Sequence, residues 1–344
     1  MTASAALPPA KLLSIELARG VAAIIVVLYH AARHLDRNVG FADGRQLFQF
    51  GHAGVDFFFV ISGFIILFVH GGDLGRPRRI GHYAARRFTR IYPIYWVILG
   101  LTVALAARSA LPSPLEVVWA AALLPTRGEP MVGVAWTLQH EIIFYGVFAV
   151  LILNLRVGAA LLGLWLGLIV HGFLPAGSRG IAAVFVSAYN LEFFFGMAAA
   201  WWLRRHEVAH PAATLALGLS LFALFAVAEV LGHVDGYAPW ARLAYGLPSA
   251  LIILGLVEME RGGRIRVPVR LLWLGRASYS IYLFHLTGIG MAYKLWVAAG
   301  LMAVAPAWIG YGVMVAAGIG GGTAVSRLVE YPLMRWTRRR LGRG

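Results

Sequence analysis

Residues 12–32 read LLSIELARGVAAIIVVLYHAA, a stretch with the length and apolarity of a membrane-spanning helix that nevertheless carries an arginine and a histidine. Arg19 and His30 lie eleven residues apart, so at about 100° per residue both point toward nearly the same face of the helix. Their separation along the helix axis is about 16 Å. An arginine at mid-membrane costs on the order of 3 kcal/mol, and such groups usually face a polar cavity. This stretch therefore indicates an enzyme or a transporter.

The rest of the chain repeats the apolar pattern. Of its 344 residues, 60% are hydrophobic and 13% are charged, which is unlike a soluble domain. Stretches of spanning length recur about ten times, whereas residues 115–125 are too short to span. We predict an all-α, polytopic membrane protein, organised as one integral-membrane domain over residues 1–344 with a short basic tail at 335–344. The predicted spans are residues 12–32, 52–70, 91–108, 133–153, 157–175, 183–203, 212–232, 239–258, 279–298 and 305–328.

The net charge of +15 follows the membrane topology rather than a nucleic-acid-binding surface. With the N-terminus placed in the cytoplasm, 20 of the 30 lysine and arginine residues are assigned to the inner side and 8 to the outer side, and Arg19 and Arg327, within spans, are assigned to neither. This distribution is the positive-inside bias of membrane proteins. We therefore expect both termini in the cytoplasm, contact with membrane lipids and no nucleic-acid partner.

Thiol and metal chemistry find little support. The chain has no cysteine, which excludes disulfides, a thiolate nucleophile and a thiolate metal site. His30 and His34 have the i, i+4 spacing of a metal-binding pair, and His52 and Asp56 follow, but nothing fixes a third ligand. We expect no metal site and no permanently bound cofactor.

Two arginines mark the inner mouth of the third span. Arg87 and Arg90 are three residues apart and share a helix face if the span begins there. The planar arginine fork matches phosphate oxygens. Together with Arg19 on the same membrane side, the pair favours a cytoplasmic polyphosphate ligand, and ordinary positive-inside charge is the alternative.

The fourth span opens with WTLQHEIIFY at residues 136–145. Glu141 lies about one helical turn from the outer surface in this orientation. His30 also lies toward the outer end of its helix, so we expect the two side chains at one depth, with Glu141 orienting His30 as a general base. A paired structural carboxylate is the alternative for Glu141.

Other polar groups within the spans favour structural roles. Asp56 is interpreted as a helix cap, and the aromatic run before Ser62 and Gly63 as packing. Glu330 is expected to pair with an inner-side arginine. His285 either lines a cavity or satisfies a buried partner.

These motifs together resemble acyltransferase family 3, membrane proteins that O-acylate bacterial surface carbohydrates. Any one motif is weak, but five in the same order over nearly the whole chain are specific. The matching features are Arg19 and His30, the run Phe57–Gly63, Arg87 and Arg90 before Ile91-Tyr92-Pro93, Trp136-Thr137-Leu138 with Glu141 and Tyr145, and Ser278–His285.

The resemblance implies acyl-CoA as donor and a glycan or glycolipid hydroxyl as acceptor. It implies that Arg19, Arg87 and Arg90 bind the donor and that His30 and Glu141 take part in transfer. We therefore expect an O-acyltransferase of the bacterial inner membrane that moves an acyl group, most simply acetyl, to a surface or exopolysaccharide glycan or its lipid-linked precursor. A transporter or flippase of a lipid-linked sugar is the alternative, since it also needs buried charges, but the halves of the chain show no inverted symmetry.

Overall fold

The computed structural model describes residues 12–106, 111–125, 128–171 and 180–341, and all regular secondary structure within these ranges is helical. Eight helical segments are long and apolar enough to cross a membrane, which confirms an all-α polytopic membrane protein. The two remaining predicted spans coincide with helices of 17 and 27 residues, α7 and α12. The elements are α1 (Leu13–Val39), α2 (Ala42–Leu47), η1 (Gln49–Ala53), α3 (Gly54–His70), η2 (Pro77–Arg79), α4 (Ile80–Ala106), α5 (Pro114–Ala121), α6 (Ala135–Leu153), α7 (Leu155–His171), α8 (Ile181–Phe185), α9 (Asn190–Leu203), α10 (Pro211–Val230), α11 (Ala241–Arg261), η3 (Val269–Leu271), α12 (Leu272–Ala298), α13 (Ala307–Val325), η4 (Ser326–Glu330) and α14 (Tyr331–Leu341).

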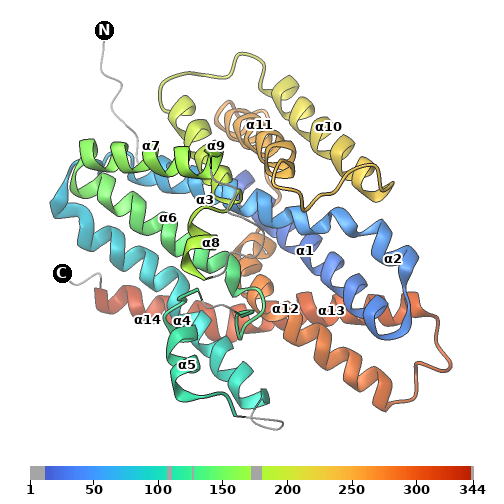
Figure 1. Cartoon of the computed structure of the whole chain (residues 1–344). Coiled ribbons are helices and arrows are strands. Elements are labelled where there is room, and N and C mark those ends of the chain that lie inside the picture. The colour runs from blue at the N-terminus through green and yellow to red at the C-terminus, as the bar shows by residue number, and fades with distance from the viewer. Residues whose placement is uncertain (1–11, 107–110, 126–127, 172–179, 342–344) are drawn as a thin grey trace.

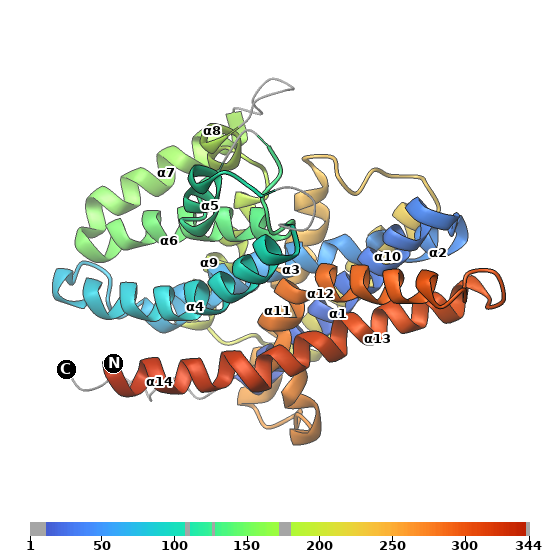
Figure 2. The ribbon, with the colours of Figure 1, turned by 90° about the horizontal axis from the view of Figure 1, so that it is seen from below.

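Helices α1 and α3 are the central elements of the bundle (Figure 1). Helix α3 packs mainly on α9 and also contacts α1, α11 and α6, whereas α1 packs mainly on α12. Figure 2 shows α4, α6 and α7 gathered at one side, with α1, α2, α10, α12 and α13 extending toward the opposite side. Residues 335–341 of the predicted basic tail are part of α14, which continues from α13 through a π-helical turn, and the last three residues of the tail lie outside the described residues.

Glycines set the closest helix contacts. A Cβ atom at Gly63 would overlap the backbone of Phe193, so α3 and α9 lie nearly backbone to backbone. A Cβ at Gly20 would lie 2.8 Å from the backbone nitrogen of Gly275, which brings α1 equally close to α12. Small residues at such crossings are typical of membrane helices. The two contacts fix the helices that carry Ser62 and Arg19.

The start of α1 is anchored by an acidic residue from α11. The Glu260 carboxylate accepts hydrogen bonds from the backbone nitrogens of Leu13 and Ser14 at 2.8 and 2.9 Å. These N–H groups have no partner within a helix, and a carboxylate there also interacts favourably with the helix dipole. Arg19 follows within two turns, so its height in the bundle is well defined.

Residues 111–125 do not cross the bundle, in agreement with the expectation for residues 115–125. Helix α5 has eight residues and begins with a capping box between Ser113 and Glu116. Hydrogen bonds from the backbone and side chain of Ser113 hold the pKa of Glu116 below its usual value. Tyr95 and Trp96 of α4 donate to carbonyl oxygens at the end of α5 at 2.7 and 2.9 Å. The segment that leads into α6 is thus held against α4.

Candidate active site

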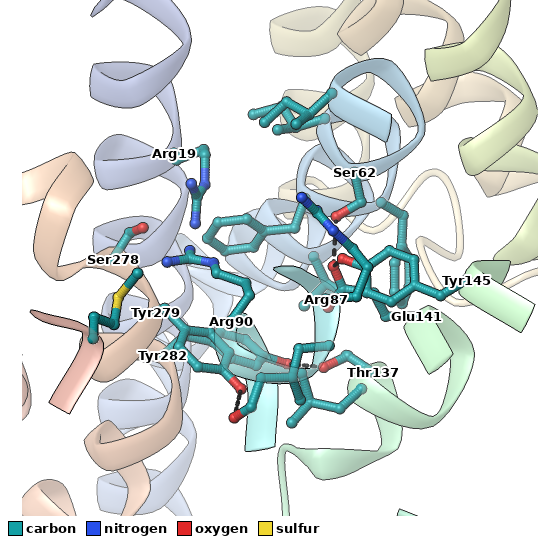
Figure 3. Close-up of a pocket in the computed structure, with 18 residues that line it drawn as sticks. Arg19, Ser62, Arg87, Arg90, Thr137, Glu141, Tyr145, Ser278, Tyr279 and Tyr282 are labelled. Atoms are coloured by element: carbon teal, nitrogen blue, oxygen red, sulfur yellow. Dashed lines mark hydrogen bonds between the residues drawn. The ribbon is translucent and has the colours of Figure 1, made fainter. Parts of the chain in front are cut away.

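A pocket of about 290 Å³ lies where α1, α3, α4, α6 and α12 meet, and we call it the inner pocket (Figure 3). Four of the five predicted site residues line it, namely Arg19, Arg87, Arg90 and Glu141. Five separate helices contribute these and the neighbouring polar groups. The other lining residues are Val55, Phe58, Phe59, Ile61, Ser62, Ile65, Ile91, Thr137, Leu138, Tyr145, Ser278, Tyr279, Tyr282 and Met334.

A second cavity of about 790 Å³ adjoins the inner pocket and shares Arg19, Ile65, Arg90 and Met334 with it. We call it the basic cavity, because five arginines and two glutamates line it. The start of α1 and the start of α14 both contribute to its wall, so it lies on the arginine-rich side that the charge bias assigns to the cytoplasm. Its charged lining residues are Arg19, Arg86, Arg90, Arg276, Arg335, Glu16 and Glu330.

Arg90 is held at the boundary between the two cavities. A guanidinium nitrogen lies 3.5 Å from the Glu330 carboxylate, and the guanidinium carbon lies 5.0 Å from the centre of the Tyr279 ring. Glu330 also accepts hydrogen bonds from Ser280 and Ser326 at 2.6 and 3.1 Å. The expectation that Glu330 pairs with an inner-side arginine is therefore confirmed.

Glu141 forms the centre of a second polar group across the pocket. Ser62 Oγ donates to Glu141 Oε1 at 3.0 Å, and the Tyr145 hydroxyl donates to the same oxygen. The Arg87 guanidinium carbon lies 5.6 Å from the centre of the Tyr145 ring. Figure 3 shows Arg87 beside this group, with Arg19 and Arg90 on the other side of the pocket.

The structure contradicts the expectation that Glu141 orients His30. His30 is not among the residues that line the inner pocket, and its Nδ1 bonds the Val26 carbonyl oxygen at 3.0 Å. Glu141 instead lines the same pocket as Arg19, and Arg19 is about 16 Å from His30 along the axis of α1. The start of α6 is held within the bundle, where Thr137 bonds the Tyr282 hydroxyl at 3.0 Å.

A row of aromatic rings leads from the inner pocket to His30. Phe58 contacts Tyr282 at 5.6 Å between ring centres, Tyr282 contacts His285 at 5.8 Å, and His285 contacts His30 at 4.9 Å. His285 is fully buried, and its Nδ1 bonds the Tyr282 carbonyl oxygen at 2.6 Å, so it satisfies a buried partner. The His30 bond to a carbonyl oxygen requires a proton on Nδ1, which leaves the lone pair on Nε2 in the neutral ring.

Asp56 has a different role from the one expected. It is not a helix cap but forms an ion pair with Arg242 at 2.6 Å, and both side chains are at most 1% exposed. The Arg242 guanidinium also lies 4.3 Å from the centre of the Tyr189 ring. Arg242 lies within the predicted span 239–258, and the structure places it buried inside the bundle at the start of α11.

The histidines near the outer end of α1 have partners other than a metal. His52 Nε2 bonds Glu229 Oε1 at 2.8 Å, and the ring of His34 packs 5.0 Å from that of Tyr293. No group of three or more metal-ligating side chains is found within the described residues.

Sequence reasoning missed the part that Ser62 plays. It assigned the segment around Ser62 to packing, yet Val55, Phe58, Phe59, Ser62 and Ile65 all line the inner pocket from one face of α3. Their spacing of three and four residues is the signal that could have revealed this face. Arg276 and Arg335 also line the basic cavity.

Comparisons with known proteins add an independent observation. Residues 12–327 match a family model described as an acyltransferase domain. The chain is 33% identical over 335 residues to the exopolysaccharide production protein ExoZ of Rhizobium meliloti (strain 1021), covering 91% of this chain and 96% of that protein. It is 31% identical over 98 residues to protein 2 in the picA locus of Rhizobium radiobacter, covering 28% of this chain and 47% of that protein. No solved structure gives a significant match.

Proposed function

This chain belongs to acyltransferase family 3 and is a membrane acyltransferase, and on that premise we propose that acyl-CoA is its donor. We further propose that the acyl group, most simply acetyl, is transferred to a hydroxyl of an exopolysaccharide or its lipid-linked precursor in the bacterial inner membrane. The name of the Rhizobium meliloti relative, an exopolysaccharide production protein, supports this choice of acceptor.

The observation that carries the donor proposal is the difference between the side chains that line the two cavities. An acyl-CoA has several phosphates at one end and an uncharged thioester at the other. The basic cavity presents five arginines, and the inner pocket beyond it presents Glu141 with hydroxyl groups around it. Arginine forks suit the phosphates, and a carboxylate beside hydroxyls suits proton transfer at the thioester. Arg19 and Arg90, which line both cavities, would hold the donor where the two meet.

We propose that His30 takes the proton of the acceptor hydroxyl. The support is the free lone pair on Nε2, together with the position of His30 beyond the pocket on the side away from the basic cavity. A donor that enters from the cytoplasm and an acceptor that enters from the opposite side would then meet in the inner pocket, which lies between the basic cavity and His30. Attack on the thioester carbonyl places negative charge on its oxygen, and the arginines of the inner pocket would stabilise that charge.

The test is transfer of label from [14C]acetyl-CoA to exopolysaccharide in membranes that contain wild-type protein or His30→Ala. We expect the wild type to label the polymer and His30→Ala to lose that activity while keeping its melting temperature in detergent. His34→Ala is the matched control, because His34 lies one turn away and lines neither cavity. Full activity of His30→Ala would refute the role of His30, and a wild type that neither binds acetyl-CoA nor labels the polymer would refute the proposed function.

A further inference from the structure

The hydroxyl of Ser62 stands in the arrangement that activates a serine nucleophile. Its oxygen donates to Glu141 at 3.0 Å, and the Tyr145 hydroxyl bonds the same carboxylate oxygen (Figure 3). A nucleophile, a base within hydrogen-bond reach and a third group that orients the base form the general pattern of covalent catalysis. All three side chains line the inner pocket.

The backbone that carries Ser62 is fixed by its neighbour. Gly63 packs against the backbone of Phe193, and a Cβ at Gly196 would overlap the Val60 carbonyl group. Helix α3 therefore cannot rotate or shift without opening its contact with α9. The orientation of the α3 face that carries Ser62 is therefore fixed by its packing on α9.

The other aliphatic hydroxyls of the pocket are engaged differently. Ser278 Oγ donates to the Gly275 carbonyl oxygen at 2.8 Å, and Thr137 Oγ1 donates to the Val134 carbonyl oxygen at 2.9 Å. Both hydroxyl protons are thus bound by a backbone carbonyl oxygen three residues earlier in the chain. Among the described residues that line the inner pocket, Ser62 is the one whose aliphatic hydroxyl donates to a carboxylate.

Cations suited to the developing charge are in the same pocket. Arg19 and Arg87 both line it, and Arg87 packs on the ring of Tyr145. Attack on a thioester carbonyl places negative charge on its oxygen, and fixed cations in a site shielded from water stabilise that charge. The pocket therefore holds a nucleophile, a base and groups for the oxyanion.

We propose that Ser62 is acylated during the reaction, an inference that rests on the proposed function. Ser62 Oγ attacks the thioester carbonyl carbon, the carbon–sulfur bond breaks, and its electron pair leaves on the CoA sulfur. The serine proton passes to Glu141 and from there to that sulfur, which releases CoA as the free thiol. The acceptor oxygen then attacks the Ser62 ester, the carbon–Oγ bond breaks, and the acceptor proton finally reaches Ser62 Oγ.

The two half-reactions use the polar groups one after the other. Glu141 lies beside the arginines that suit the donor, whereas His30 lies beyond the rings of Tyr282 and His285. An acyl-serine allows CoA to leave toward the basic cavity before the acceptor reacts. Glu141 then belongs to acylation and His30 to the step that uses the acceptor.

The test is acid-quenched labelling of the purified protein with [14C]acetyl-CoA in detergent and without acceptor. We expect the wild type and His30→Ala to carry label on the peptide that contains Ser62, as an oxygen ester that resists neutral hydroxylamine. Ser62→Ala should carry none, and its CoA release should fall on the order of 10²-fold. Ser220→Ala is the control, since Ser220 is exposed on α10 and lines neither cavity.

Ser62→Cys keeps the size of the side chain and changes the chemistry of the bond. We expect its label to be a thioester that neutral hydroxylamine cleaves within minutes. Label that stays an oxygen ester in Ser62→Cys, or acetyl transfer by Ser62→Ala at the wild-type rate, would overturn the role of Ser62 and leave the proposed function standing. If the wild type neither binds acetyl-CoA nor releases CoA from it, the proposed function itself fails.

Discussion

Replacing Arg90 with alanine should weaken donor binding more than it slows the saturated reaction. Arg90 lines both cavities, and its charge is balanced by Glu330 at 3.5 Å in the absence of a ligand. A hydrogen bond to a charged group contributes about 1.5–3 kcal/mol. Because about 1.4 kcal/mol is tenfold in an equilibrium constant, we expect the Kd for acetyl-CoA to rise roughly 10- to 150-fold.

The same substitution has a second consequence that the structure predicts. Glu330 is only 5% exposed, so Arg90→Ala leaves a buried carboxylate without its guanidinium partner and close to where the phosphates bind. Part of the lost affinity then comes from repulsion between the Glu330 carboxylate and the phosphates of the donor. The double variant Arg90→Ala/Glu330→Gln should bind acetyl-CoA severalfold more tightly than Arg90→Ala alone, since contacting residues couple by about 0.5–3 kcal/mol.

The assay is titration calorimetry with acetyl-CoA in detergent, followed by steady-state rates at saturating donor. Arg156→Ala is the matched control, because Arg156 is an exposed arginine just after α6 that lines neither cavity. An Arg90→Ala protein with unchanged donor affinity would refute the assignment of Arg90 to the phosphates. So would a double variant that binds more weakly than Arg90→Ala.

Three further predictions follow from the packing and the site. Gly63→Ala should lower the stability by about 1–3 kcal/mol, seen as a lower melting temperature, because its Cβ has no room, whereas Gly100→Ala faces open space and should change nothing. Arg242→Ala should cost about 3–5 kcal/mol and reduce the yield of folded protein, and the double change Arg242→Met/Asp56→Leu should restore that yield. Tyr145→Phe should lower the maximal rate about tenfold and leave the Kd for acetyl-CoA unchanged, because only the bond that orients the base is removed.

The helices could be predicted from the sequence because the membrane leaves the chain little choice. Within lipid, every backbone polar group must be satisfied inside the segment, so apolar runs of spanning length become helices. The grouping of Arg19 with Arg87 and Arg90 could also be predicted, since all three lie toward the ends of spans on one side. The spacing of residues in the sequence predicts where each of them lies along its own helix.

The errors concern depth and pairing, which depend on tertiary contacts. Glu141 and His30 seemed level because both lie toward outer helix ends, but Glu141 shares a pocket with Arg19, which is about 16 Å from His30 along α1. Asp56 was expected to be a helix cap, yet it is buried in an ion pair with Arg242 of α11. The role of Ser62 required its distance to Glu141, which no local pattern contains.

The most direct test of the account is release of CoA from acetyl-CoA by purified protein in detergent, wild type against Glu141→Gln. Glutamine keeps the shape of the side chain and an acceptor for Ser62 and Tyr145, but it cannot take up the proton. The account predicts that the wild type releases CoA and that Glu141→Gln releases it on the order of 10²-fold more slowly, with the Kd for acetyl-CoA changed little. Equal release by the two proteins would contradict the claim that the inner pocket is where transfer begins.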